Sequence, residues 1–132
     1  MKKIPSNISK KHIVVFDSIF HQKISVLLNY SAEDYAKWLN KNKIKDVVIE
    51  SFNDFSGWTS EFTTEKETTK RIIFIPRFQW TLEEQGTLIH EIVHVIIKIW
   101  QANNIPYNQD TQEFLAHSIA NLYEDIGGKL LN

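Results

Sequence analysis

The chain has 132 residues, of which 42% are hydrophobic, 12% are aromatic and 23% are charged. These proportions predict a single globular domain over residues 1–132, because disordered chains contain fewer apolar residues and two domains usually need a longer chain. The absence of cysteine excludes disulfide frameworks, cysteine-bound zinc, iron–sulfur clusters and thiol nucleophiles. Any metal ion must therefore be bound by histidine and carboxylate side chains.

Charge is distributed unevenly along the chain. Residues 1–45 carry nine lysines and three acids, a net charge of +6, whereas the remainder carries six basic and thirteen acidic residues, a net charge of −7. The lysines are scattered, without interleaved arginine or aromatic residues, so we expect a solvated face and no nucleic-acid partner. We expect residues 1–11 to form a flexible basic N-terminus.

Neither a signal peptide nor a membrane span is predicted. The apolar stretch 13–20 is interrupted by Asp17, and no small-residue cleavage site follows it. The longest apolar run, 88–100, contains four polar or charged residues and is shorter than the roughly twenty apolar residues of a membrane span. We therefore expect a cytoplasmic protein without a membrane partner.

The N-terminal part of the chain predicts short strands followed by a helix. Residues 12–20 and 23–28 are rich in Ile, Val and Phe, which is typical of a strand or a hairpin. Residues 31–42 predict a helix, because Ser31 can cap its start and the following apolar residues lie at helical spacing on one face.

The next segment predicts two to four strands. Residues 47–49 form a short apolar run, residues 57–63 alternate between two faces, and residues 71–75 are continuously apolar or long. Pro76 cannot donate to a sheet and should end the last strand. The polar residues 63–70 are expected to form a hairpin loop.

A long helix follows these strands and has a clear start signal. Thr81 can act as its N-cap, and Glu84 stands three residues later, which is the spacing of a capping box. We expect this helix to run to about Asn103.

A second long helix is predicted from Asp110 or Thr111. Its apolar stripe consists of Leu115, Ile119, Leu122 and Ile126. Gly127-Gly128 should end it with a left-handed cap. The predicted fold is α+β: a small antiparallel or mixed sheet packed on the first long helix and a following antiparallel helix, with one N-terminal helix.

The first long helix contains His90-Glu91-Ile92-Val93-His94, an H-E-x-x-H motif. Residues four apart on a helix project to the same side, so both imidazoles can reach one ion at about 2.0 to 2.1 Å. Glu91 is turned about 100° from His90, which suits a group that reaches a metal-bound water. Apolar residues on nearly every face predict a buried helix, in which three unpartnered ionisable groups would cost several kcal/mol. A metal ion would supply the partner.

Catalytic zinc sites use three protein ligands and leave a fourth position for water. His12 and His21 lie in the basic N-terminal half, whereas Glu113 and His117 lie four apart on the next helix, with Glu113 nineteen residues after His94. We favour Glu113 as the third ligand. His117 is the alternative ligand, and otherwise it supports a ligand by a hydrogen bond; Glu113 could instead be a simple capping residue.

The motif followed by Glu113 on the next helix, over residues 81–126, resembles the gluzincin metallopeptidases. The resemblance implies bound zinc and a third ligand at Glu113. In that clan an Asp four residues later orients the first motif histidine, whereas this chain has His117. If His117 takes the place of that Asp, His90 is oriented by a side chain that donates or accepts a hydrogen bond according to its tautomer.

Residues 113–120 are also similar to the downstream helix of the ImmA/IrrE-type peptidases. Size and layout are closer still to small H-E-x-x-H proteins encoded by phages and prophages, which implies a bacterial host or phage setting. Members of this clan bind extended peptide on an edge strand, and residues 71–75 are the candidate here, although a core strand fits the same residues.

The resemblance also implies a mechanism. Zinc lowers the pKa of its bound water toward 7, and Glu91 takes the proton and later returns it to the leaving amine. Tyr107, in the loop between the two long helices, is the first candidate for stabilising the oxyanion. His117 and Tyr123 follow, although the spacing of Tyr123 is more typical of the core.

Two functions from different classes are compatible with these residues. The first is a zinc-dependent metallopeptidase that acts on a peptide or protein substrate. The second is a phage-type structural or protein-binding module that keeps a zinc site without turnover. His and carboxylate ligands also suit Mn, Fe, Co or Ni. A homodimer, or a phage or host protein partner, could supply a cleft wall that so short a chain lacks.

Overall fold

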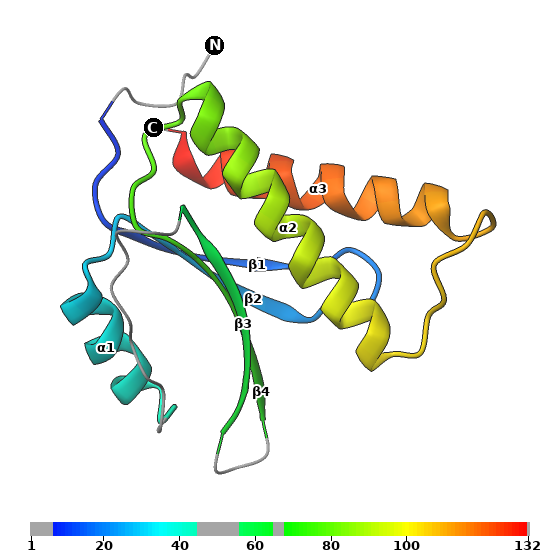
Figure 1. Cartoon of the computed structure of the whole chain (residues 1–132), viewed down its shortest axis with the longest axis horizontal. Coiled ribbons are helices and arrows are strands. Elements are labelled where there is room, and N and C mark those ends of the chain that lie inside the picture. Colours follow the sequence, from blue (N-terminus) through cyan, green and yellow to red (C-terminus); the bar gives the residue numbers. More distant parts are fainter. Residues whose placement is uncertain (1–6, 45–55, 65–67, 132) are drawn as a thin grey trace.

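The computed structural model describes residues 7–44, 56–64 and 68–131. A mixed four-stranded sheet forms its middle layer (Figure 1). One helix, α1 (Ala32–Lys41), covers one face of the sheet, and two long helices, α2 (Leu82–Ala102) and α3 (Gln112–Leu130), cover the other. The predicted α+β class, with a small sheet and helices packed on it, is confirmed.

The sheet has the strand order β1-β2-β4-β3. β1 (Lys11–Phe16) and β2 (Lys23–Leu28) form the predicted hairpin, and β4 (Thr69–Ile75) pairs parallel with β2 and antiparallel with β3 (Trp58–Thr63). The prediction of an edge strand at 71–75 is therefore wrong, because β4 is hydrogen-bonded on both sides. Among the described strands, β3 is the edge strand on that side. The predicted strand 47–49 lies outside the described residues.

The start signals predicted for two helices are confirmed. The Ser31 hydroxyl accepts a hydrogen bond from the backbone N–H of Asp34 at 3.0 Å, which caps α1. Thr81 and Glu84 form the complete capping box at the start of α2. α2 ends at Ala102, with Asn103 as C-cap, close to the predicted boundary.

The predicted end of α3 at Gly127-Gly128 is wrong, because the helix continues to Leu130 and neither glycine has a positive φ. A Cβ at Gly127 would lie 3.5 Å from the Trp80 indole, which is ordinary van der Waals contact, so packing does not require glycine here. Trp80 in turn stacks on Tyr123, with ring centroids 5.5 Å apart.

Residue Ile8 belongs to the packed structure, although the sequence predicts a flexible segment over 1–11. Its side chain is only 3% exposed. Its backbone N–H donates to Gln79 Oε1 at 2.7 Å, and its carbonyl accepts from Gln79 Nε2 at 2.9 Å. The C-terminal part of the predicted flexible segment is thus held in the fold, while residues 1–6 lie outside the described residues.

Tyr35 gives the fold a measurable dependence on alkaline pH. Its ring stacks on Phe74, with centroids 4.3 Å apart, and is 6% exposed. Burial raises the pKa of Tyr35 to about 12, against a smaller opposing effect of the hydrogen bond with Ser60. The unfolded chain therefore loses this proton first, so the associated stability is complete below pH about 10 and is lost as the pH rises toward 12.

We expect the free energy of unfolding to fall less between neutral and alkaline pH in the Tyr35→Phe variant than in the wild type. The difference should be on the order of 2 kcal/mol by pH about 12. Urea unfolding at a series of pH values measures it. Some alkaline sensitivity should persist, because burial also raises the pKa of Tyr30 and Tyr123. Equal pH slopes in the variant and the wild type would contradict this account.

Candidate metal centre

The H-E-x-x-H motif lies in the middle of α2, and its residues divide between two sides of the helix. The side that packs on the sheet is formed by Leu88, Ile92, Val95, Ile96 and Ile99. Both histidines are exposed, and Ile89 and Ile97 are 42% and 38% exposed. The prediction that α2 is buried on nearly every face is wrong. The burial argument for a metal ion therefore does not apply to His90 or His94.

The two motif histidines are spaced as two ligands of one metal ion would be. His90 Nε2 and His94 Nε2 are 3.1 Å apart. Two nitrogens that each lie about 2.0 to 2.1 Å from one ion, at the tetrahedral angle of about 109°, are separated by about 3.3 Å. The observed separation corresponds to an angle of about 100° at the ion. The separation is that of a hydrogen bond between the two rings, and it is also compatible with two positions of a tetrahedral zinc site.

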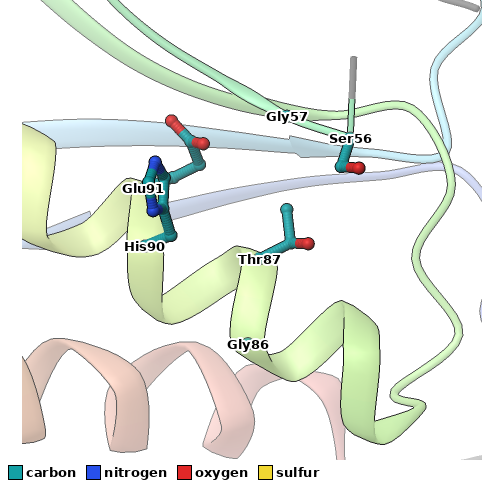
Figure 2. A pocket seen from close by; sticks show the side chains of 6 residues that line it. All are labelled: Ser56, Gly57, Gly86, Thr87, His90 and Glu91. Carbon is teal, nitrogen blue, oxygen red and sulfur yellow. The ribbon is translucent and has the colours of Figure 1, made fainter. Parts of the chain in front are cut away.

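Glu91 is buried, at 6% exposure, and its partner is a hydroxyl group of the edge strand. Thr59 Oγ1 lies 2.8 Å from Glu91 Oε1 and 3.0 Å from the Glu91 carbonyl oxygen. A carboxylate on this side of α2, with the imidazoles on the exposed side, matches the predicted turn of about 100° between ligand and base. The carboxyl group lies between α2 and β3 (Figure 2).

An open pocket of about 390 Å³ adjoins the motif (Figure 2). It is lined by Ser56, Gly57, Gly86, Thr87, His90 and Glu91. A Cβ on Gly57 would lie 3.1 Å from Thr87 Cγ2 and 3.3 Å from Glu91 Cγ, so a larger residue here would require these side chains to shift by a few tenths of an ångström. At Gly86 a Cβ would meet nothing within 4 Å. The pocket therefore presents small and polar groups beside the motif.

The sequence prediction missed Thr59 and the pocket residues that precede it. Alternation along residues 57–63 places Thr59 and Glu61 on one face and Trp58 on the other, but it does not tell which face meets α2. Thr59 and Glu91 are separated by 32 positions in the chain. The one available signal was Gly57, because a glycine at the start of a strand often marks a close approach by another backbone or side chain.

Glu113 and His117 form a pair of their own at the start of α3. His117 Nε2 lies 3.2 Å from Glu113 Oε1, and the side chains are 81% and 70% exposed for Glu113 and His117 respectively. The capping role considered for Glu113 is not observed, because Thr111 is the N-cap and makes no side-chain capping bond. In the described part of the chain, no three His, Asp or Glu side chains lie close enough together to hold a metal ion.

The arrangement of α2 and α3 explains why the predicted ligands are not gathered. The helices meet where Tyr123 donates a hydrogen bond to Gln85 Oε1 at 2.7 Å, near the start of α2 and the end of α3. They separate toward their connecting loop (Figure 1). Glu113 belongs to the separated end. His90 and His94 therefore lie together on α2, whereas Glu113 and His117 form a separate, exposed pair on α3.

The other predicted polar residues lie apart from the motif histidines. Tyr107 is 68% exposed in the loop between α2 and α3, and Tyr123 packs against Trp80, as its spacing suggested. His12 stands edge-on to Trp38 of α1, with centroids 5.4 Å apart, on the sheet face opposite α2. Burial, and then the charge of Lys23, lowers the pKa of His12. His12 therefore cannot complete the motif's ligand set.

Comparisons of the chain with models of protein families, with curated proteins and with solved structures found no match. Over the described ranges 7–44, 56–64 and 68–131, no helix is both long and apolar enough to cross a membrane. The candidate site therefore rests on the geometry of this chain alone.

Proposed function

We propose that this protein is a zinc-dependent metallopeptidase, which hydrolyses a peptide bond through a metal-activated water. One observation carries the proposal: two imidazole nitrogens stand 3.1 Å apart on the exposed side of α2, beside a buried carboxyl group that lines a pocket. His90 and His94 are the proposed ligands, and Glu91 is the proposed base. Mn, Fe, Co or Ni would suit the same donors.

Each residue has a distinct part in the proposed reaction. Bound zinc would lower the pKa of a coordinated water toward 7 and polarise the substrate carbonyl. Glu91 accepts the proton of the attacking water and returns it to the leaving amine. Glu113 is the proposed third ligand, and His117, 3.2 Å from it, would orient it; since the described residues hold no cluster of three metal-binding side chains, the start of α3 would have to move toward the motif for Glu113 to bind. Tyr107 remains the proposed donor to the oxyanion.

The edge strand β3 is the proposed docking site for an extended substrate. No described strand pairs with the outer side of β3, and an extended peptide can pair with a strand edge of this kind. β3 is also the strand that contacts the motif, through Thr59 and Glu91. This proposal replaces β4, which is paired on both sides. The proposed setting is the cytoplasm of a bacterial host or an infected cell.

A second function is favoured by exposed apolar residues on the motif helix. Ile89 and Ile97 of α2 are 42% and 38% exposed, on the same side as the motif histidines. Exposed apolar side chains that gather on one surface are typical of contacts with another protein. A structural or binding module, acting as a homodimer or with a phage or host protein, would use these residues and keep the metal without turnover.

Hydrolysis of extended peptides separates the two functions. Protein purified without a His tag and loaded with zinc should cleave members of a peptide panel, lose this activity in a chelator and regain it when zinc is restored. His94→Ala should be inactive and folded, whereas His21→Asn, which changes an exposed histidine of the β1–β2 turn, should retain activity. Zinc-loaded wild type that binds these peptides without cleaving them would reject the peptidase and favour the binding module.

A further inference from the structure

In the described part of the chain, one hydroxyl group contacts the buried Glu91 carboxyl group. Its side chain is 6% exposed, so most of its contact with water is lost. A buried carboxyl group needs hydrogen bonds to offset this loss. Among the described residues, the Thr59 hydroxyl is the one group that donates to it, at 2.8 Å from Oε1. The position of the Glu91 carboxyl group therefore depends on Thr59.

The geometry of this contact fixes one carboxyl oxygen and leaves the other. The Thr59 hydroxyl has one proton and two acceptors within reach, Oε1 at 2.8 Å and the Glu91 carbonyl oxygen at 3.0 Å. The proton holds the carboxyl group only when it is donated to Oε1, which is the nearer acceptor. Oε2 is left for proton exchange. A carboxylate that is held through Oε1 needs less reorganisation when it takes a proton on Oε2.

Thr59 is itself held rigidly by the edge strand. It stands opposite Ile73 in the β3–β4 ladder, while its neighbour Trp58 packs against Phe74 on the opposite sheet face, with ring centroids 5.6 Å apart. Strand alternation therefore directs Thr59 toward α2. A β-branched side chain also has few χ1 rotamers, so the hydroxyl is aimed with little loss of side-chain entropy.

We infer that Thr59 is a positioning residue, whose hydroxyl orients the Glu91 carboxylate for proton transfer. This inference rests on the proposed function and deepens it. The strand that would receive the substrate also holds the base, so a single element aligns the scissile bond and the group that activates the water. Thr59 touches neither the substrate carbonyl nor the metal ion in this scheme, and it acts through Glu91.

Two substitutions at position 59 separate the hydroxyl from the rest of the side chain. Thr59→Val keeps the shape and removes the hydroxyl, and it should lower kcat about tenfold while KM changes by less than about twofold. Thr59→Ser keeps the hydroxyl and should restore most of kcat. In a Glu91→Gln background, Thr59→Val should cause no further loss. Thr69→Val, the same change at an exposed threonine of the neighbouring strand β4, should leave kcat unchanged.

A double-mutant cycle on the metal-free protein gives a readout that does not depend on turnover. Thr59→Val and Glu91→Ala should be non-additive in urea unfolding, with a coupling of about tenfold in the unfolding equilibrium constant. Additive effects would overturn the inference. So would a fully active Thr59→Val, or equal losses in the Val and Ser variants. Wild type that cleaves no peptide would instead overturn the proposed function, and the positioning role with it.

Discussion

Replacing Glu91 with glutamine should reduce peptide hydrolysis by about 10²-fold or more, because the amide cannot act as a general base. Zinc content and Tm should change little. Glutamine keeps the shape of the side chain, and its carbonyl oxygen can still accept the hydrogen bond from Thr59 that measures 2.8 Å in the wild type. The substitution therefore removes the base and leaves the contact between α2 and β3 in place.

The measurement is the initial rate on the most rapidly cleaved peptide, with metal content determined on the same samples. Glu83→Gln is a matched control, because Glu83 is an exposed acid in the first turn of the same helix and does not line the pocket. It should keep full activity. If wild type and Glu91→Gln show equal residual hydrolysis, Glu91 is not the base and the peptidase proposal fails.

Replacing Glu113 with alanine should weaken zinc binding by orders of magnitude, as expected for a lost ligand. His117→Ala should cost about 10- to 100-fold, the usual effect of a residue that orients a ligand. Both side chains are largely exposed, at 81% and 70%, so neither variant should lose much stability. Competition with a chelating dye measures both affinities, and unfolding curves check the fold.

Glu124→Ala removes another exposed acid from α3 and should leave zinc affinity unchanged, which controls for a general loss of negative charge. The ligand assignment is wrong if His117→Ala loses zinc while Glu113→Ala keeps it. Unchanged affinity in both variants would show that the third ligand lies elsewhere in the chain or in a second copy of it.

Local signals made the helix starts predictable. Ser31 and Thr81 are capping residues with side-chain bonds that span three positions, so the sequence contains both partners of each bond. The motif spacing is also local, since one turn of helix brings His90 and His94 together. These features depend on neighbours in the chain, and the structure confirms them.

Features that depend on distant contacts were not predictable in the same way. The position of β4 inside the sheet follows from its parallel pairing with β2, far away in the sequence. Its buried residues 72–75 are apolar on both faces, a pattern that is typical of a central strand and favours that position over an edge. The apolar residues of α2 overstated its burial because α3 covers only part of it.

The same limit applies to one glycine and one hydroxyl group. Gly127 was expected to end a helix, but a glycine can also lie within one, and α3 continues to Leu130. Thr59 contacts Glu91 across 32 positions, and nothing in the strand's alternation distinguishes it from other threonines. Sequence patterns therefore predicted the chemistry of the motif better than the residues that hold it in place.

Metal analysis of protein purified without a His tag tests the central claim most directly. After incubation with excess zinc and removal of free metal, the wild type should retain one zinc ion per chain, and the double variant His90→Ala/His94→Ala should retain none. The proposed function predicts this result, and the spacing of 3.1 Å between the two imidazole nitrogens is compatible with it. Wild type that binds no zinc even at excess would contradict the proposed metal site, and the H-E-x-x-H motif would then be a chance occurrence.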